Sequence, residues 1–336
     1  MPESSRENIN APARLLERLY LPFLIEAQNA DGGWGYRHGG QSAAEPTSGV
    51  LLAFLGLSRS ADAATSRRLN SSTPRLLESA CESGINWLRK CQLPDGSWPP
   101  FAGQPRGCWV TSPASLALQA RGDSIDHVSR GLGWLSQAWP AEGALWRRLA
   151  AKLTRSEPSV RQDRSLRGWS WTPGSASWVE PTAWALLAFR SIPEELHPPA
   201  AAKRRSLAER MLYDRMCPGG GWNSGNPLVY GAAGVPRIGP TVWALLALQA
   251  SRSRPENCRS LDWLEQAYPQ IPGPASLALA HLCLEIHGRS VSDLESDLTA
   301  LNSHNQFLGH TLAAAWAAMA LSGKPRWLGP SAACAD

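Results

Sequence analysis

The chain has 336 residues, of which 43% are hydrophobic and 18% charged, and its formal net charge is +5 at pH 7. This length allows one large domain or two ordinary ones, and the hydrophobic share is enough for a substantial core. The charge is mild and no basic block is interleaved with aromatic residues, so nucleic-acid binding is not expected.

Neither a leader segment nor a membrane-spanning helix is expected from the sequence. Residues 1–10 are polar and charged, and no apolar run approaches the ~18 residues that cross a bilayer. The seven cysteines form no C-x-x-C pair, which argues against a zinc ribbon or a disulfide framework and favours a reducing compartment. The histidines show no ligand spacing either. We therefore expect a cytoplasmic protein with no metal and no other cofactor.

The sequence repeats a pair of helical patterns. An amphipathic segment is followed by a Gly-rich turn, and then by a segment rich in Ala, Leu and Trp with almost no charge. In chain order, the pairs are expected at 14–28 with 46–57, 74–92 with 113–120, 124–139 with 181–189, 201–216 with 240–250, 259–268 with 274–286, and 291–301 with 310–321.

The uncharged segments begin with related sequences. An acidic or small polar residue followed by Pro and then an apolar run is a strong helix start. Six starts of one kind indicate an internal repeat. They are Glu45-Pro46-Thr47, Glu180-Pro181-Thr182 and Gly239-Pro240-Thr241, with looser copies at Ser112-Pro113-Ala114 and Gly273-Pro274-Ala275, and a last one without Pro at His310-Thr311.

This repeat predicts the fold class. A helix that is apolar on nearly every side must be surrounded by protein. Six such helices shielded by six amphipathic ones predict two concentric layers, an all-α (α/α)6 toroid. The alternative, an open solenoid, needs polar capping repeats at its ends, and none is visible. We expect a polar arm at 1–10, a single toroid domain at 11–322 with an insert at about 140–166, and a tail at 323–336.

The turns after the amphipathic segments carry a family signature. Trp87-Leu88, Gln92, Gly96 and Trp98 match the QW repeat of the terpene cyclases, and residues 23–34 match it equally well. A third copy, at 208–222, has Met216 in place of Gln. The chain thus resembles the prenyltransferase/squalene-cyclase repeat family, as a stand-alone barrel similar to the class II squalene–hopene cyclases. The resemblance extends over about residues 12–322 and implies the toroid fold.

The resemblance also points to a catalytic acid. Class II cyclases carry a D-x-D-D-T-A motif at a helix start. When Thr182-Ala183 is aligned with the T-A of the motif, Glu180 takes the position of the proton-donating Asp. Trp178 and Pro181 take the positions of the other two Asp residues, so only one of the three acids is kept. Because the helix N-terminus favours ionisation of a single carboxyl, a capping role is the alternative for Glu180 and for the similar Glu45. Neither D-x-D-D nor D-D-x-x-D occurs in the chain, and the zinc ligands of prenyltransferase β subunits have no matching motif.

The loops before the uncharged segments supply side chains that we expect to face a central cavity. An aromatic lining with few polar groups suits an apolar ligand such as a polyisoprenoid. The resemblance implies that aromatic faces would also stabilise carbocations. Loop packing is the alternative for each residue. The candidates are Tyr36, Trp109, Trp169, Trp171, Trp178, Asn223, Tyr230, Arg237 and His310.

Three functions remain open at this stage. The first is an isoprenoid-binding, cyclase-like protein, which could be a divergent cyclase or isomerase. The second is a non-catalytic toroid that binds a lipid or a peptide. The third is an (α/α)6 carbohydrate-active enzyme with Glu45 and Glu180 as its acid and base, which would require the two carboxyls within about 10 Å. The basic segment 145–153 could rest on an anionic membrane surface, or it could be an ordinary outer helix.

Overall fold

The computed structural model describes residues 15–59, 73–122, 125–141, 161–271, 273–304, 309–323 and 325–328, most of them helical. They fall into two compact units. Unit 1 joins the N-terminal part, up to Cys91, to the C-terminal part from Tyr268 to Gly329, and unit 2 contains Gln92–Ala267. The single domain expected at 11–322 stays a prediction. The segment 145–153 lies outside the described residues.

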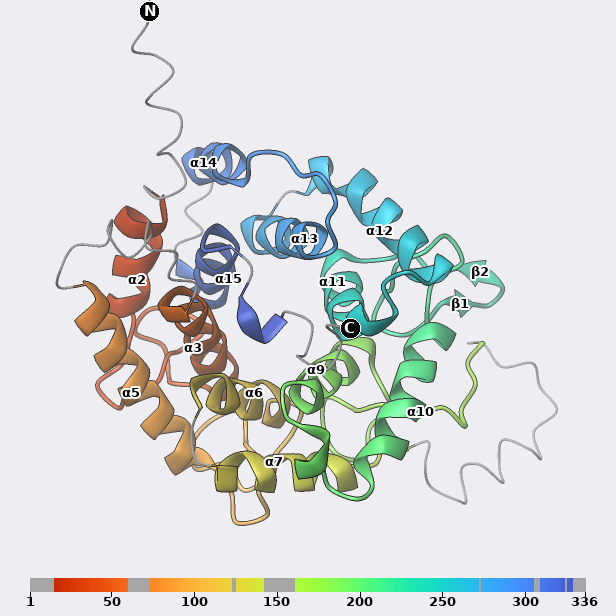
Figure 1. Ribbon diagram of the computed structural model, residues 1–336, viewed down its shortest axis with the longest axis horizontal. Helices are drawn as coiled ribbons and strands as arrows, with labels where there is room; N and C mark the ends of the chain where they lie inside the picture. Colours follow the sequence, from red (N-terminus) through yellow and green to blue (C-terminus); the bar gives the residue numbers. More distant parts are fainter. Residues whose placement is uncertain are drawn as a thin grey trace, which may run out of the picture. The chain divides into compact units, whose positions relative to one another are not determined.

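Unit 1 has three uncharged helices covered by amphipathic ones (Figure 1). Helix α15 contacts both α3 and α13, while α5 packs on α3 and α14 packs on α13. The elements are the π-helical turn η3 (Leu16–Tyr20), α2 (Leu21–Glu26), α3 (Ala44–Arg59), α5 (Thr73–Cys91), η7 (Tyr268–Gln270), α13 (Pro274–Ile286), α14 (Leu294–His304), α15 (Thr311–Leu321) and η9 (Arg326–Leu328).

Unit 2 is built in the same way around α9. Helix α9 lies between α6 and α11 and is covered by α7 and α10, while α12 packs on α11 (Figure 1). Its elements are α6 (Thr111–Arg121), α7 (Ile125–Gln137), α9 (Val179–Arg190), η5 (Glu194–Leu196), α10 (Ala201–Asp214), β1 (Leu228–Val229), β2 (Ala232–Ala233), α11 (Ile238–Ala247), η6 (Gln249–Ser251) and α12 (Pro255–Ala267). The antiparallel hairpin β1–β2 pairs Leu228 with Ala233 and Val229 with Ala232, and the sequence pattern had not indicated it.

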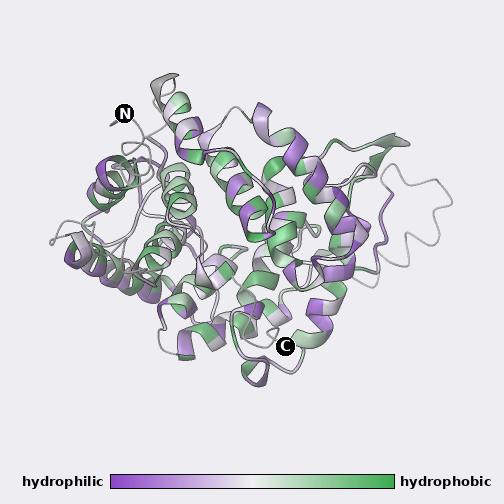
Figure 2. Cartoon of the chain, turned by 45° about the horizontal axis from the view of Figure 1, so that its top comes forward, coloured by the Kyte–Doolittle hydropathy of each residue, from purple (hydrophilic) through white to green (hydrophobic). Residues whose placement is uncertain are grey.

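The uncharged helices form the cores of both units. Every residue of α9 from Pro181 to Phe189 is buried, and so is every residue of α15 from Thr311 to Ala320. Figure 2 shows the contrast with the amphipathic helices, whose hydrophilic residues alternate with hydrophobic ones along each helix. The sequence prediction that uncharged helices are surrounded by protein holds within each unit.

A repeated hydrogen bond ties each turn to the start of the next uncharged helix. We call it the Trp–Thr bracket. A threonine Oγ1 accepts the backbone N–H of the turn tryptophan, whose peptide group is buried and needs a partner. The pairs and N–O distances are Trp34 and Thr47 at 2.9 Å, Trp98 and Thr111 at 3.0 Å, Trp169 and Thr182 at 2.9 Å, and Trp222 and Thr241 at 2.8 Å.

The indole rings complete this bracket. Trp34, Trp98 and Trp222 are fully buried. The indole N–H donates backward to a leucine carbonyl in the preceding amphipathic helix, from Trp34 to Leu24, from Trp169 to Leu135 and from Trp222 to Leu212. Each tryptophan therefore joins an amphipathic helix to the uncharged helix that follows, which is the packing role expected for an aromatic residue with one polar atom.

At the second helix start the threonine comes earlier than the sequence pattern indicated. The alignment of Ser112-Pro113-Ala114 with the other starts puts Ala114 at the threonine position. Instead, Thr111 accepts the Trp98 N–H, in a tighter turn in which the Thr111 N–H bonds to the Cys108 carbonyl. The bracket is kept although the local sequence is shifted.

Each glutamine of the two complete motifs links its own turn to the amphipathic helix that follows. Gln28 Nε2 donates to the carbonyl of Gly32 in its own turn and to that of Ala80 in α5, at 2.8 and 2.9 Å. Gln92 Nε2 donates to Gly96 and to His127 in α7, both at 2.9 Å. Each amide thus replaces water at two carbonyl groups.

Other side chains make the connecting contacts where the glutamine is absent. The Arg204 guanidinium from α10 lies between the rings of Trp139 and Trp169, 4.0 and 4.1 Å from their centroids. Its Nη2 donates to the carbonyls of Ala138 and Gly168. In the next copy, Met216 Sδ accepts from the Ser260 hydroxyl of α12 at 3.8 Å.

We predict that Thr47→Val destabilises the protein by about 1–3 kcal/mol, because the buried Trp34 N–H loses its acceptor while the side-chain volume is kept. The matched control in the same unit is Thr311→Val. Thr311 is also fully buried at a helix start, but its Oγ1 has no hydrogen-bond partner. Urea unfolding should show a lowered midpoint for Thr47→Val only. Equal midpoint shifts in the two variants would contradict the structural role of the bracket.

Candidate functional site

Unit 1 brings together Tyr36, Arg37, Glu45 and His310, which we call the Glu45 group. The Tyr36 hydroxyl donates a 2.5 Å hydrogen bond to Glu45 Oε2. The rings of Tyr36 and His310 meet edge to face with centroids 6.4 Å apart. Arg37 forms an isolated antiparallel bridge with His310, and the Thr311 N–H bonds to the Tyr36 carbonyl at 2.9 Å. The loop before α3 is therefore fixed to the start of α15.

The electrostatics of Glu45 differ from the sequence expectation. Its position in the first turn of α3 favours ionisation through the partial positive charge of the helix end. Burial disfavours the charged form and outweighs the Tyr36 hydrogen bond, so the pKa of Glu45 is raised above its usual value. The expectation that a single Glu at this place is driven towards ionisation is therefore wrong for Glu45, because the carboxyl loses its water.

His310 caps α15. Its Nδ1 accepts the backbone N–H of Ala313 at 3.4 Å. Burial and the nearby Arg37 lower the pKa of His310, so the ring is neutral at neutral pH. Because Nδ1 is the acceptor, the proton of the neutral ring lies on Nε2.

Unit 2 brings together half-buried aromatic residues before α6 and α9. The rings of Trp109 and Trp171 pack edge to face with centroids 4.8 Å apart, and the Trp109 N–H bonds to the Trp171 carbonyl. Trp178 is joined to the Trp169 backbone by an isolated bridge. We call Trp109, Trp171 and Trp178 the aromatic group. All three keep part of their surface exposed.

Glu180 lies one helical turn before Trp184, which forms a buried pair with Trp243. A Cβ atom at Gly239 would lie 3.3 Å from Glu180 Oε1, so this glycine at the start of α11 leaves room for the carboxyl. Four residues further along each helix, the rings of Trp184 and Trp243 are in contact, with centroids 4.2 Å apart and planes tilted by 40°. Sequence reasoning missed Trp184, Trp243 and Gly239. The signal in the sequence was that Trp184 and Trp243 each lie four residues, about one helical turn, after the first residue of the repeated helix start.

The other candidates do not join the aromatic group. The Trp169 ring is only 3% exposed and is held in the bracket against Arg204. Asn223 Oδ1 accepts the N–H groups of Gly225 and Asn226, which makes it a turn residue. Arg237 is exposed at the N-cap of α11. Tyr230, expected to face the cavity, is 86% exposed at the tip of the β1–β2 hairpin.

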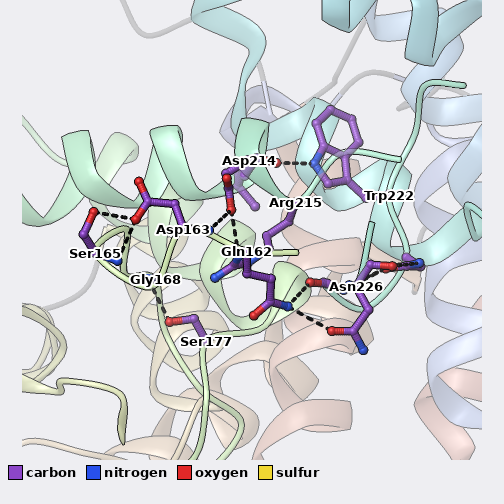
Figure 3. Close-up of polar contacts among 12 residues, drawn as sticks. Gln162, Asp163, Ser165, Gly168, Ser177, Asp214, Arg215, Trp222 and Asn226 are labelled. Carbon is purple, nitrogen blue, oxygen red and sulfur yellow. Dashed lines mark hydrogen bonds and ion pairs between the residues drawn. The ribbon is translucent and has the colours of Figure 1, made fainter. Parts of the chain in front are cut away.

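Figure 3 shows how the loop before α9 is joined to the loop after α10. Gln162 Nε2 donates to the Gly225 carbonyl and to Asn226 Oδ1. The Asp163 N–H donates to Asp214 at the end of α10, and Asp163 itself accepts from Ser165. These contacts fix the base of the hairpin.

Two further properties concern only the described part of the chain. Within it, no group of three or more His, Cys, Asp and Glu side chains is arranged to hold a metal ion. None of the helices in the same ranges is both long and apolar enough to cross a membrane.

Comparison with known proteins identifies structural relatives only. No family model and no curated protein sequence matches the chain. The apo structure of the type II terpene cyclase MstE from Scytonema matches with a TM-score of 0.59 and 13% identity, covering 93% of this chain and 98% of that one. An MstE variant in complex with its substrate geranylgeranyl dihydroxybenzoate also matches with a TM-score of 0.59 and 13% identity, covering 94% and 97%. A protein from Actinoplanes matches with a TM-score of 0.55 and 14% identity, covering 94% and 98%.

At this level of identity the likeness establishes the fold alone. The predicted all-α class is confirmed, and the chain has a fold like that of the class II terpene cyclases. The relation indicated by the sequence motifs is therefore confirmed at the level of fold.

We predict that the stability of the Glu45→Gln variant increases relative to that of the native protein as pH rises. A carboxyl whose pKa is raised on folding contributes most to stability below its unfolded value of 4.5, and that contribution is lost as pH rises through the folded-state pKa. The variant cannot ionise and avoids this loss. Thermal unfolding should show that the stability difference between the variant and the native protein grows as pH rises above about 4.5.

Glu194→Gln is the control of opposite sign. The Arg205 ion pair lowers the pKa of Glu194, so its contribution is present above 4.5 and is lost in acid. The variant should therefore become relatively less stable as pH rises. Parallel pH profiles for Glu45→Gln and the native protein would show that the Glu45 pKa is not raised.

Proposed function

We propose that the chain is an isoprenoid-binding protein with a terpene-cyclase-like fold, and that its apolar ligand packs against the aromatic group of unit 2. One observation supports this most. The chain matches, over 94% of its length, a structure of MstE that holds geranylgeranyl dihydroxybenzoate. A protein with this fold can therefore accommodate a long isoprenoid chain.

The chemistry of the aromatic group agrees with such a ligand. Trp109, Trp171 and Trp178 are half-buried, so they keep some surface for contact with a ligand. The edge-to-face packing of Trp109 and Trp171 fixes their orientation before a ligand arrives. An isoprenoid offers apolar surface and π-bonds without groups that need hydrogen bonds, so it can cover these rings without leaving a polar atom unpaired.

We predict that Trp171→Leu weakens binding of geranylgeranyl dihydroxybenzoate about ten-fold or more, since a large apolar contact is lost. Equilibrium dialysis, with detection of the ligand by mass spectrometry, measures the affinity. Tyr230→Asn is the matched control, because it also removes an aromatic ring but from an exposed hairpin tip. Absence of binding to the native protein, both for this compound and for squalene, would overturn the proposal.

A second candidate function is acid catalysis on an isoprenoid bound at unit 1, with Glu45 as the proton donor. The specific observation in its favour is the raised pKa of Glu45 together with the 2.5 Å hydrogen bond from Tyr36. A raised pKa keeps the carboxyl protonated to higher pH, and a hydroxyl donor stabilises the carboxylate once the proton has left. A divergent isomerase or cyclase needs both properties. Glu180 remains the alternative acid.

We expect Glu45→Gln to lower any turnover of geranylgeranyl dihydroxybenzoate or squalene by about a hundred-fold or more, while ligand affinity stays within about two-fold. Product analysis of extracted lipids, with Glu180→Gln in parallel, separates the two acids. Loss of turnover in Glu180→Gln alone would assign the acid to Glu180. Binding without turnover in the native protein would favour the non-catalytic alternative, a lipid- or peptide-binding module.

The carbohydrate-active alternative stays a prediction. It would use Glu45 and Glu180 together, and these residues belong to different units. Oligosaccharides in the same dialysis assay distinguish it, because tight oligosaccharide binding with no isoprenoid binding would favour that enzyme class.

A further inference from the structure

The β1–β2 hairpin of unit 2 presents apolar side chains to solvent. Tyr230 is 86% exposed and Val235 is 78% exposed, the two highest values among the large hydrophobic residues of the described chain. Ala232 and Ala233 of β2 are exposed as well. Single exposed apolar side chains are common on protein surfaces, but several within one short segment indicate an interaction site. Figure 2 shows the hairpin in the colour of hydrophobic residues, extending away from the helices of its unit.

The conformation of the tip is unusual for a tyrosine. Tyr230 and Gly231 have φ angles of 49° and 77°, the left-handed values of a two-residue type I′ turn. Asn or Gly is favoured at the first of these positions, and an aromatic residue there is unfavourable. Because the ring is exposed, its packing within the chain does little to offset the unfavourable backbone conformation. Such a residue suggests that the ring acts outside the protein.

The base of the hairpin is rigid, so the tip is held away from the helices. The Gly234 N–H bonds to the Pro227 carbonyl, and Asn223 Nδ2 donates to the Asn226 carbonyl. Gln162 fixes Asn226 from the other side, as Figure 3 shows. A Cβ at Gly234 would lie 2.5 Å from Asn223 Nδ2, so this close packing depends on glycine.

Two exposed arginines lie in the segments next to the hairpin. The Arg161 N–H bonds to the carbonyl of Leu228 in β1, which places this exposed arginine beside the strand. Arg237, four residues after β2, is also exposed. The two acids near the base each bond to a neighbouring side chain. The exposed Asp163 accepts a hydrogen bond from Ser165, and Asp214 pairs with Arg215.

We propose that this hairpin docks the protein onto an anionic lipid bilayer, with Tyr230 and Val235 inserted at the interface and the arginines paired with lipid phosphates. A tyrosine suits the interface because its ring is apolar and its hydroxyl remains in water. Flanking arginines add attraction to anionic lipid. A second copy of the chain fits less well, because the strands are two residues long and the arginines would repel their equivalents.

Co-sedimentation of the full chain with vesicles tests this surface. The native protein should bind vesicles of phosphatidylcholine with about a third phosphatidylserine, and should bind pure phosphatidylcholine at least about five-fold less. Tyr230→Asn and Val235→Asn should each weaken binding by about five-fold or more. Asn also tolerates the left-handed turn, so Tyr230→Asn keeps the hairpin. Arg161→Gln should weaken vesicle binding about five-fold. High salt should weaken binding of the native protein in the same way, because it screens the attraction between arginine and lipid phosphate.

Leu196→Asn is the control, because Leu196 is 46% exposed in the same unit and follows Glu194 and Glu195. It should bind vesicles like the native protein. Native-like binding by both hairpin variants, or no binding of the native protein to the anionic vesicles, would overturn the proposal. So would a dimer in solution that the hairpin variants abolish while no vesicle binding is seen. Isoprenoid binding by Tyr230→Asn should stay unchanged, which separates this surface from the ligand site.

Discussion

Four buried tryptophan N–H groups need acceptors, and the threonine hydroxyls at the next helix starts supply them. An unpaired amide in these positions would be costly, so each turn is held at a fixed place above its helix. At three of these starts the residue two positions before the threonine lies in the first helical turn, and its identity differs between the copies. These residues are Glu45, Glu180 and Gly239. The bracket thus provides a constant frame on which single residues change chemistry without changing the fold.

The sequence was a good guide to the helices because their pattern is extreme. A run with almost no charge such as Pro274–Ile286 is expected to be mostly buried, and α13 has these bounds. The hairpin could not be foreseen, because strands of two residues carry no periodicity and Tyr-Gly is not a favoured turn pair. The role of Trp169 could not be foreseen either. Its ring is held by Arg204 from another helix, and no local pattern reports that contact.

The fading of the glutamine motif along the chain has a physical explanation. The structural need is a link between a turn and the next amphipathic helix, and an amide is one of several groups that provide it. Arg204 does so by stacking between two indoles while donating to two carbonyls, and burial lowers its pKa to about 10, so it remains charged at neutral pH. Met216 provides a weaker link through a hydroxyl donor. Motif matching loses such copies, although the helices remain paired.

Glu45 shows how burial can raise the pKa of one carboxyl. In a cluster of carboxylates, like-charge repulsion holds a proton on one member. Around Glu45 the same direction of shift comes from loss of water, against a helix end and a tyrosine hydroxyl that both favour the ion. The balance is adjustable, because the hydroxyl is supplied by a loop that the start of α15 fixes in place. Movement of that loop would remove a donor and push the pKa further up, so control of this acid depends on how firmly Tyr36 is held by the backbone of His310 and Thr311.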